Sequence, residues 1–183
     1  MAKKAVILLA TGFEEIEAIT VIDILRRAGI EIIIAGLDGI NIKGSHGITV
    51  AADKKISDLK PEFDAIILPG GMPGALHLHN SIEVNNFIKD MYSKGALIAA
   101  ICAAPSVVMA PIGLLENKNA TCYPGDQIDF GKTTRYKDKA VVIDGNIITS
   151  QGPGTSIEFA LTIVEKIIGE ETVKKLKKHL LAR

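Results

Sequence analysis

The chain has 183 residues, enough for one domain with a sizeable hydrophobic core. Lysine plus arginine and aspartate plus glutamate each number 21, so no net basic charge favours binding to nucleic acid. Two cysteines are too few for a disulfide framework, and no apolar run reaches membrane-spanning length, so we expect a cytoplasmic protein that binds neither nucleic acid nor a membrane.

Apolar runs and helical patterns alternate along the first part of the chain. Residues 5–10 predict a buried strand, residues 13–28 a helix that ends at Gly29, and residues 30–35 a second strand. This order is typical of a βαβ unit with a right-handed crossover. Residues 36–53 are rich in glycine and polar residues, and they predict a β-hairpin or a small antiparallel excursion.

The middle of the chain repeats the alternation. Residues 65–68 predict a third buried strand, and the glycine-rich residues 69–74 predict a loop. Ser81 predicts the N-cap of a helix over residues 82–93, and residues 96–101 predict another buried strand.

The last third predicts a hairpin and two helices. Residues 140–150 form the hairpin, with a type I′ turn expected at Asp144-Gly145. Thr155 is expected to cap the next helix, with Glu158 completing a capping box. Residues 171–181 predict a final amphipathic helix.

Together these elements predict a single domain over residues 1–183. The fold class is three-layer α/β, with a mostly parallel sheet and an added β-hairpin. Ligands bind beyond the carboxyl ends of the strands in such sheets. Residues 10–13, 69–74 and 102–105 are therefore expected to meet at one site.

A cysteine lies where a predicted strand meets a predicted helix. Cys102 follows the strand over residues 96–101, and Pro105 suits the first turn of a helix. A thiol there faces unpaired N–H groups at the positive end of the helix dipole, which favours the reactive thiolate. This layout is that of a nucleophile elbow. The alternative is an ordinary small buried cysteine.

Glu17 heads an apolar row of the first helix that continues to Ala28. We expect its side chain to point inward at the top of the sheet. Burial raises the pKa of a carboxyl, which can then hydrogen-bond a thiolate or act as a general acid and base. The alternative is a partly exposed Glu17 paired with Arg26 or Arg27.

Backbone N–H groups complete the expected site. Gly70 and Gly71 are predicted to point N–H groups at a developing oxyanion, together with the N–H of Ala103. The glycine loop lacks the spacing of a dinucleotide fingerprint. His77 and His79 are two residues apart and face different ways on a helix, so we expect no metal site.

Five sequence motifs are distributed along the chain between residues 14 and 165. They are EEIEA at 14–18, RRAGI at 26–30, LPGGMPGA at 68–75, AAICAAP at 99–105 and TSQGPGTSIEFALTIVE at 149–165. Taken together they resemble the ThiJ/PfpI superfamily, and within it the parkinsonism-associated deglycase branch.

The resemblance implies a flavodoxin-like fold, also called class I glutamine amidotransferase-like. It implies that Cys102 is the nucleophile, Glu17 its carboxyl partner, and Gly70, Gly71 and Ala103 the anion pocket. It also implies that no cofactor is needed and that the chain forms a homodimer that packs around the first helix.

The implied function is a cysteine-dependent glyoxalase or deglycase that acts on 2-oxoaldehydes or early glycation adducts. The alternative is a redox-sensing stress protein or chaperone with an oxidisable, low-pKa cysteine. An intracellular peptidase is less expected, because the peptidase branch places histidine where this chain has Ala103. Several deglycase-branch members carry histidine where this chain has Tyr123, and tyrosine is a poor base at neutral pH. A variant of the redox alternative places Cys122 near the same cleft, where it would resolve a sulfenic acid as a disulfide.

Overall fold

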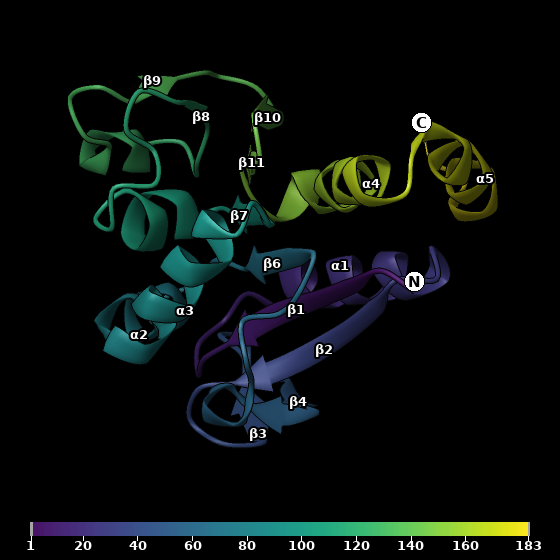
Figure 1. Ribbon diagram of the computed structural model, residues 1–183, viewed down its shortest axis with the longest axis horizontal. Helices are drawn as coiled ribbons and strands as arrows, with labels where there is room; N and C mark the ends of the chain where they lie inside the picture. Colours follow the sequence, from purple (N-terminus) through teal and green to yellow (C-terminus); the bar gives the residue numbers. More distant parts are fainter. Residues whose placement is uncertain (1, 183) are drawn as a thin grey trace.

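The computed structural model describes residues 2–182, and in them the main sheet has seven strands in the order β10-β11-β7-β6-β1-β2-β5 (Figure 1). The strands are β1 (Lys4–Leu9), β2 (Glu31–Gly36), β5 (Lys54–Lys55), β6 (Ala65–Leu68), β7 (Leu97–Ile101), β10 (Val141–Asp144) and β11 (Ile147–Ser150). Neighbouring strands are parallel, except for the β10–β11 hairpin. The predicted fold class is thereby confirmed.

Helices cover both faces of this sheet. On one side lie α1 (Glu15–Arg27), α4 (Ser156–Ile167) and α5 (Glu170–Leu180). On the other lie α2 (Gly74–Asn80), α3 (Ile82–Ser93) and a short π-helix, η2 (Pro105–Met109). The molecule therefore has the three layers that the sequence predicts.

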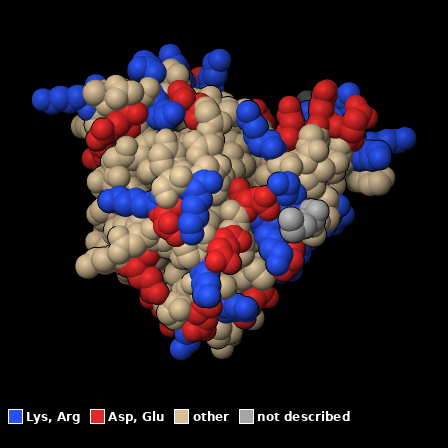
Figure 2. Space-filling model, in the orientation of Figure 1, with Lys and Arg blue, Asp and Glu red and all other residues tan. Residues whose placement is uncertain are grey.

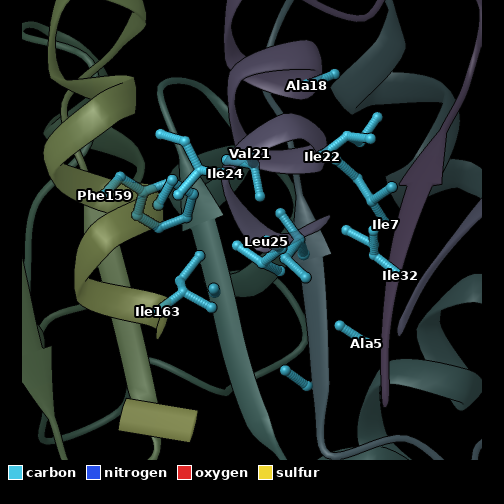
Figure 3. Close-up of a cluster of buried hydrophobic side chains, with 14 of the residues drawn as sticks. Ala5, Ile7, Ala18, Val21, Ile22, Ile24, Leu25, Ile32, Phe159 and Ile163 are labelled. Atoms are coloured by element: carbon cyan, nitrogen blue, oxygen red, sulfur yellow. The ribbon is translucent and has the colours of Figure 1, made fainter. Parts of the chain in front are cut away.

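The two cores explain why the strands are apolar without alternation. Ile7 points into the core under α1 and α4, whereas Leu8 points into the core under α2 and α3. Figure 3 shows the first core, where Phe159 of α4 packs toward Val21 and Leu25 of α1. Each fully buried side chain of this size stabilises the fold by about 1.5–3 kcal/mol.

A small hairpin, β3 (Asn41–Lys43) and β4 (Thr49–Ala51), follows β2, as predicted. Two backbone hydrogen bonds fix it against the loop between β1 and α1. The N–H of Gly12 donates to the carbonyl of Lys43 (2.8 Å), and the N–H of Ser45 donates to the carbonyl of Phe13 (2.9 Å). The turn of this hairpin therefore lies at the start of α1.

The remaining short elements belong to connections. They are the 3₁₀ turns η1 (Ile56–Asp58), η3 (Asp126–Asp129) and η4 (Pro153–Thr155), and a two-stranded pair, β8 (Asn119–Ala120) and β9 (Arg135–Tyr136). No helix in the described part of the chain has the length and apolarity needed to cross a bilayer. On the face shown in Figure 2, basic and acidic side chains are interspersed.

Two local predictions are wrong. Asp144 pairs with Ile147, so the β10–β11 loop consists of Gly145 and Asn146, and only Gly145 has a positive φ (64°). A type I′ turn needs a positive φ at both central positions. Thr155 precedes α4 but makes no side-chain cap, because its hydroxyl donates to the carbonyl of Gly152 at 2.8 Å.

Candidate active site

The carboxyl ends of three adjacent strands bring the predicted residues together. β1 leads into α1, which carries Glu17, and β6 leads into the loop that contains Gly70 and Gly71. β7 ends at Ile101, directly before Cys102. The prediction that these three strand ends meet is therefore correct.

Cys102 occupies a strained elbow. Its φ is +62°, a left-handed conformation that costs a residue with a side chain about 1–2 kcal/mol. Backbone bonds hold it on both sides, since its N–H donates to the carbonyl of Ser150 (3.0 Å) and its own carbonyl accepts from the N–H of Tyr123 (2.9 Å). The side chain remains partly exposed, so Cys102 is an accessible thiol held in one orientation.

Glu17 is fully buried and points at this elbow. Its Oε2 accepts a hydrogen bond from the N–H of Gly70 at 2.7 Å. A Cβ added at Gly70 would touch both this oxygen and the side chain of Cys102, so the carboxyl and the thiol are neighbours. Arg26 lies 3.8 Å from Asp53, and Arg27 lies 2.8 Å from an aspartate one turn earlier in α1. The inward orientation is thus confirmed, and the alternative pairing with an arginine is excluded.

Burial raises the pKa of Glu17 to about 7. The N–H of Gly70 and the Cys102 thiol oppose this rise, and the negative charge of Glu14 adds to it. A carboxyl with such a pKa exchanges a proton readily near neutrality, which suits a general acid and base. The other oxygen of Glu17, Oε1, is buried and has no partner of good hydrogen-bond geometry among the described residues.

The role predicted for the N–H of Gly70 is wrong. That N–H is already used by Glu17 and has no second hydrogen to offer an oxyanion. The N–H groups of Ala103 and Gly71 instead face the Cys102 sulfur, where both lower the pKa of the thiol. These two N–H groups remain as candidate oxyanion donors, whereas Gly70 positions the carboxyl.

Burial works against the low thiol pKa that the helix start favours. Burial raises the pKa of Cys102 strongly, and the charge and hydrogen bond of Glu17 raise it further. The two N–H groups from Ala103 and Gly71 do not outweigh these effects. Glu17 and Cys102 therefore compete for one negative charge, and a proton on Glu17 removes its electrostatic opposition to the thiolate.

The predicted auxiliary residues, Cys122 and Tyr123, lie beside the elbow in the segment that follows β8. Tyr123 is about half exposed and hydrogen-bonds Cys102 only through its backbone N–H. Cys122 is fully buried, and burial, with the charges of Asp126 and Asp129, raises its pKa to about 12. A resolving thiol must be reachable and ionised, so the structure argues against that role for Cys122.

A second charged cluster borders the site, and sequence reasoning does not predict it. The Glu15 carboxylate accepts hydrogen bonds from the backbone N–H of His46 (2.7 Å) and pairs with its ring Nδ1 (2.8 Å). Burial opposes ionisation of Glu15, but these bonds hold its pKa at about 2, and Glu15 in turn raises the pKa of His46. Glu14 lies 3.5 Å from the same nitrogen.

The cluster depends on a close approach of the hairpin turn. A side chain at Gly44 would overlap the Glu15 carboxylate. Ligand atoms of Glu14, Glu15 and His46 lie within 4.8 Å of one another, a spacing that metal ions use, and they already bond to each other. Residues 31 positions apart carry no sequence signal for this contact.

Comparisons with known proteins agree with this geometry. The chain is 42% identical to Drosophila melanogaster DJ-1beta over 99% of its length and 98% of the relative. The crystal structure of that protein superposes with a TM-score of 0.96 over all of both chains. Oxidized Toxoplasma gondii DJ-1 superposes with a TM-score of 0.94, at 41% identity over 98% of each chain.

A further relative carries an activity in its name. The Caenorhabditis elegans protein named glutathione-independent glyoxalase DJR-1.2 is 39% identical, over 97% of this chain and 96% of its own. The sequence profile described as DJ-1/PfpI family matches residues 3–166. The resemblance inferred from the five motifs is therefore confirmed: the chain belongs to the DJ-1/PfpI family.

Proposed function

We propose that the chain is a cofactor-independent glyoxalase or deglycase of one domain, with Cys102 as nucleophile and Glu17 as general acid and base. One observation carries the proposal. The carboxyl of Glu17, with a pKa raised to about 7, is buried beside the strained and accessible thiol of Cys102. The glyoxalase name of the nematode relative supports the same reaction class.

The reaction begins with addition of sulfur to an aldehyde. The Cys102 thiolate attacks the aldehyde carbon of a 2-oxoaldehyde such as methylglyoxal and forms a hemithioacetal. Negative charge moves from sulfur to the former aldehyde oxygen. The N–H groups of Ala103 and Gly71, which already face the sulfur, are placed to stabilise this oxyanion.

Glu17 then moves a proton between two carbons. Glu17, which is protonated while the thiolate attacks, first gives its proton to the oxyanion and becomes a carboxylate. The carboxylate removes a proton from the former aldehyde carbon and returns it to the neighbouring carbon, while the hydroxyl proton moves to the neighbouring oxygen. These transfers turn the hemithioacetal into a thioester of a 2-hydroxy acid. Water hydrolyses the thioester, so that lactate leaves and the thiol is restored. The substrate supplies both the oxidised and the reduced carbon, and no external redox partner takes part.

Lactate formation from methylglyoxal tests this function. Wild type should produce lactate, whereas Cys102→Ser and Glu17→Gln should lose at least about 100-fold in rate. Cys122→Ser is the matched control, because its thiol is buried and outside the proposed chemistry. If wild type forms no more lactate than Cys102→Ser, the proposed function is wrong.

A second candidate function is redox sensing. The partly exposed Cys102 suits oxidation, and one structural relative is described as oxidized. Mild peroxide should add two oxygens to Cys102 as a sulfinic acid and leave the buried Cys122 unmodified. Intact-mass measurement and peptide mapping check this, and an unmodified Cys102 would exclude the sensor function.

We further propose that the chain forms a homodimer through α1. Ile16 and Ile19 are exposed on this helix, by 56% and 43%, and Ile48 of the neighbouring hairpin is exposed by 58%. Exposed apolar side chains grouped in this way are typical of protein interfaces. Sedimentation should give twice the monomer mass, and Ile16→Glu should shift it toward the monomer.

A further inference from the structure

We propose that Thr155 is a positioning residue of the candidate active site: its hydroxyl fixes the turn between β11 and α4, and this turn supports the backbone on both sides of Cys102. The role rests on the proposed function in taking Cys102 as the nucleophile. It assigns to Thr155 an action through the backbone, at a position where the sequence predicts only a helix cap.

The Thr155 hydroxyl is used within its own turn and not at the start of the helix. It donates to the carbonyl of Gly152 at 2.8 Å and accepts from the N–H of Gly152 at 3.1 Å. The helix α4 therefore begins without a side-chain cap from Thr155, although such a cap would stabilise it. The hydroxyl thus stabilises the turn at the expense of the helix start.

One branch of contacts leads from this hydroxyl to the N–H of Cys102. The hydroxyl of Ser150 lies 2.6 Å from Oγ1 of Thr155 and 2.8 Å from the carbonyl oxygen of Ala140. Ser150 is fully buried, so water does not compete for its hydroxyl. The carbonyl of Ser150 accepts from the N–H of Cys102 at 3.0 Å. Ser150 therefore connects Thr155 directly to the elbow.

A second branch leads to the carbonyl of Cys102. Gly152 is buried and packs against the ring of Tyr123, since a Cβ added at Gly152 would lie 3.4 Å from Cδ2 of that ring. The N–H of Tyr123 donates to the carbonyl of Cys102 at 2.9 Å. One hydroxyl, that of Thr155, thus supports the residues that bind both sides of the Cys102 backbone.

The backbone of Cys102 needs this support because its φ of +62° is disfavoured for a residue with a side chain. Such a conformation persists only where the surrounding contacts fix it. If the turn loosens, the backbone can relax, and the sulfur then moves relative to the N–H groups of Ala103 and Gly71 that face it. These are the donors proposed for the oxyanion, so turnover should suffer more than substrate binding.

Amide hydrogen exchange, measured by NMR on the full chain, tests the inference without a substrate. Thr155→Val removes the hydroxyl and should accelerate exchange at the N–H groups of Cys102 and Tyr123 about tenfold, as expected for the loss of one hydrogen bond. Thr155→Ser keeps the hydroxyl and should follow wild type. Thr162→Val is the matched control, because its hydroxyl donates to the carbonyl of Glu158 within α4.

Three results would overturn the inference. The first is unchanged exchange of both N–H groups in Thr155→Val. The second is an equal effect of Thr155→Ser, which would exclude the hydroxyl as the cause. The third is equal acceleration at Ile7 of β1, two strands away from β7, because that result would report a loss of overall stability.

A second variant keeps the test decisive where Thr155→Val does not fold. Ser150→Ala breaks the first branch alone, so exchange should accelerate at the N–H of Cys102 and less at that of Tyr123. An unchanged rate at Cys102 would contradict the inference.

Lactate formation adds a kinetic measurement. Thr155→Val should lower kcat about 10- to 100-fold with KM nearly unchanged, and Thr155→Ser should restore kcat. A loss confined to KM would refute the positioning role. Exchange and lactate formation are separate measurements, so a wild-type chain that forms no lactate, together with the expected exchange pattern, refutes the proposed function alone.

Discussion

The backbone N–H of Gly70 donates a hydrogen bond of 2.7 Å to Oε2 of Glu17, across 53 positions of the chain. Through this bond the loop after β6 positions the carboxyl of Glu17, which α1 carries into the site. The bond holds this buried carboxyl against Cys102, and it leaves the N–H of Gly70 unable to stabilise an oxyanion.

Glu17→Gln should stabilise the fold at alkaline pH although it loses lactate formation. The pKa of Glu17 is about 7 in the folded protein, compared with an ordinary value of 4.5. The folded state binds more protons between these values, so the stability of wild type falls as pH rises through this window. Glu17→Gln removes the cost of burying the charge and should be roughly 3 kcal/mol more stable than wild type at pH 8.

Urea unfolding at pH 5 and pH 8 measures this difference. At pH 5 the wild-type carboxyl is mostly protonated, so the two proteins should differ little. Glu158→Gln, at an exposed residue of α4, controls for removal of an acidic group at the surface. The same stability difference at both pH values would show that Glu17 does not titrate as a buried acid.

Gly70→Ala should damage the site sterically. An added Cβ would lie 2.6 Å from the Cβ of Cys102 and 3.0 Å from the N–H nitrogen of Ala103. We expect a loss of about 1–3 kcal/mol in stability, together with loss of lactate formation. Gly154→Ala is the control, since no atom lies within 4 Å of its added Cβ; equal effects of both substitutions would contradict the close approach.

Tyr123→His should accelerate lactate formation. The resemblance to deglycase-branch proteins places a histidine at this position, and imidazole titrates near neutral pH whereas a phenol does not. An added base at the elbow should raise kcat about tenfold or more. Tyr123→Phe should leave the rate nearly unchanged, and a large loss in that variant would instead make the phenol a participant.

Gly44→Ala should loosen the hairpin from α1. The added methyl group meets the Glu15 carboxylate, which accepts hydrogen bonds from the N–H groups of His46 and Ile48. We expect a loss of about 1–3 kcal/mol in urea unfolding. Gly131→Ala, with open space around its added Cβ, should change stability little, and equal stability of the two variants would refute the contact.

The strands and the meeting of their ends could be predicted from sequence. Residues 65–68 were expected as a strand and form β6, because a strand buried on both faces is apolar without alternation. Ser81 caps α3 as expected, by accepting a bond from the N–H of Val84 at 3.3 Å. The inward orientation of the Glu17 side chain could be predicted from helical spacing alone.

Contacts that depend on the direction of a backbone N–H, or on how a loop docks against a helix, could not be predicted from sequence patterns. A glycine in the sequence does not say which way its N–H points. The sequence therefore suggests that the N–H of Gly70 faces a ligand, whereas in the structure it donates to Glu17. The position of His46 depends on how a hairpin turn docks onto α1, and no periodicity encodes that. The thiol pKa of Cys102 depends on burial, which outweighs the local effect of a helix start.

The left-handed backbone at Cys102 has a consequence for the choice of mutants. Serine and alanine at this position keep a side chain and so inherit the same torsional cost, whereas glycine is released from it. Comparing wild type with Cys102→Ser or Cys102→Ala therefore isolates the sulfur. Cys102→Gly would relax the elbow as well, and its kinetics would mix the loss of a nucleophile with a change of main-chain shape.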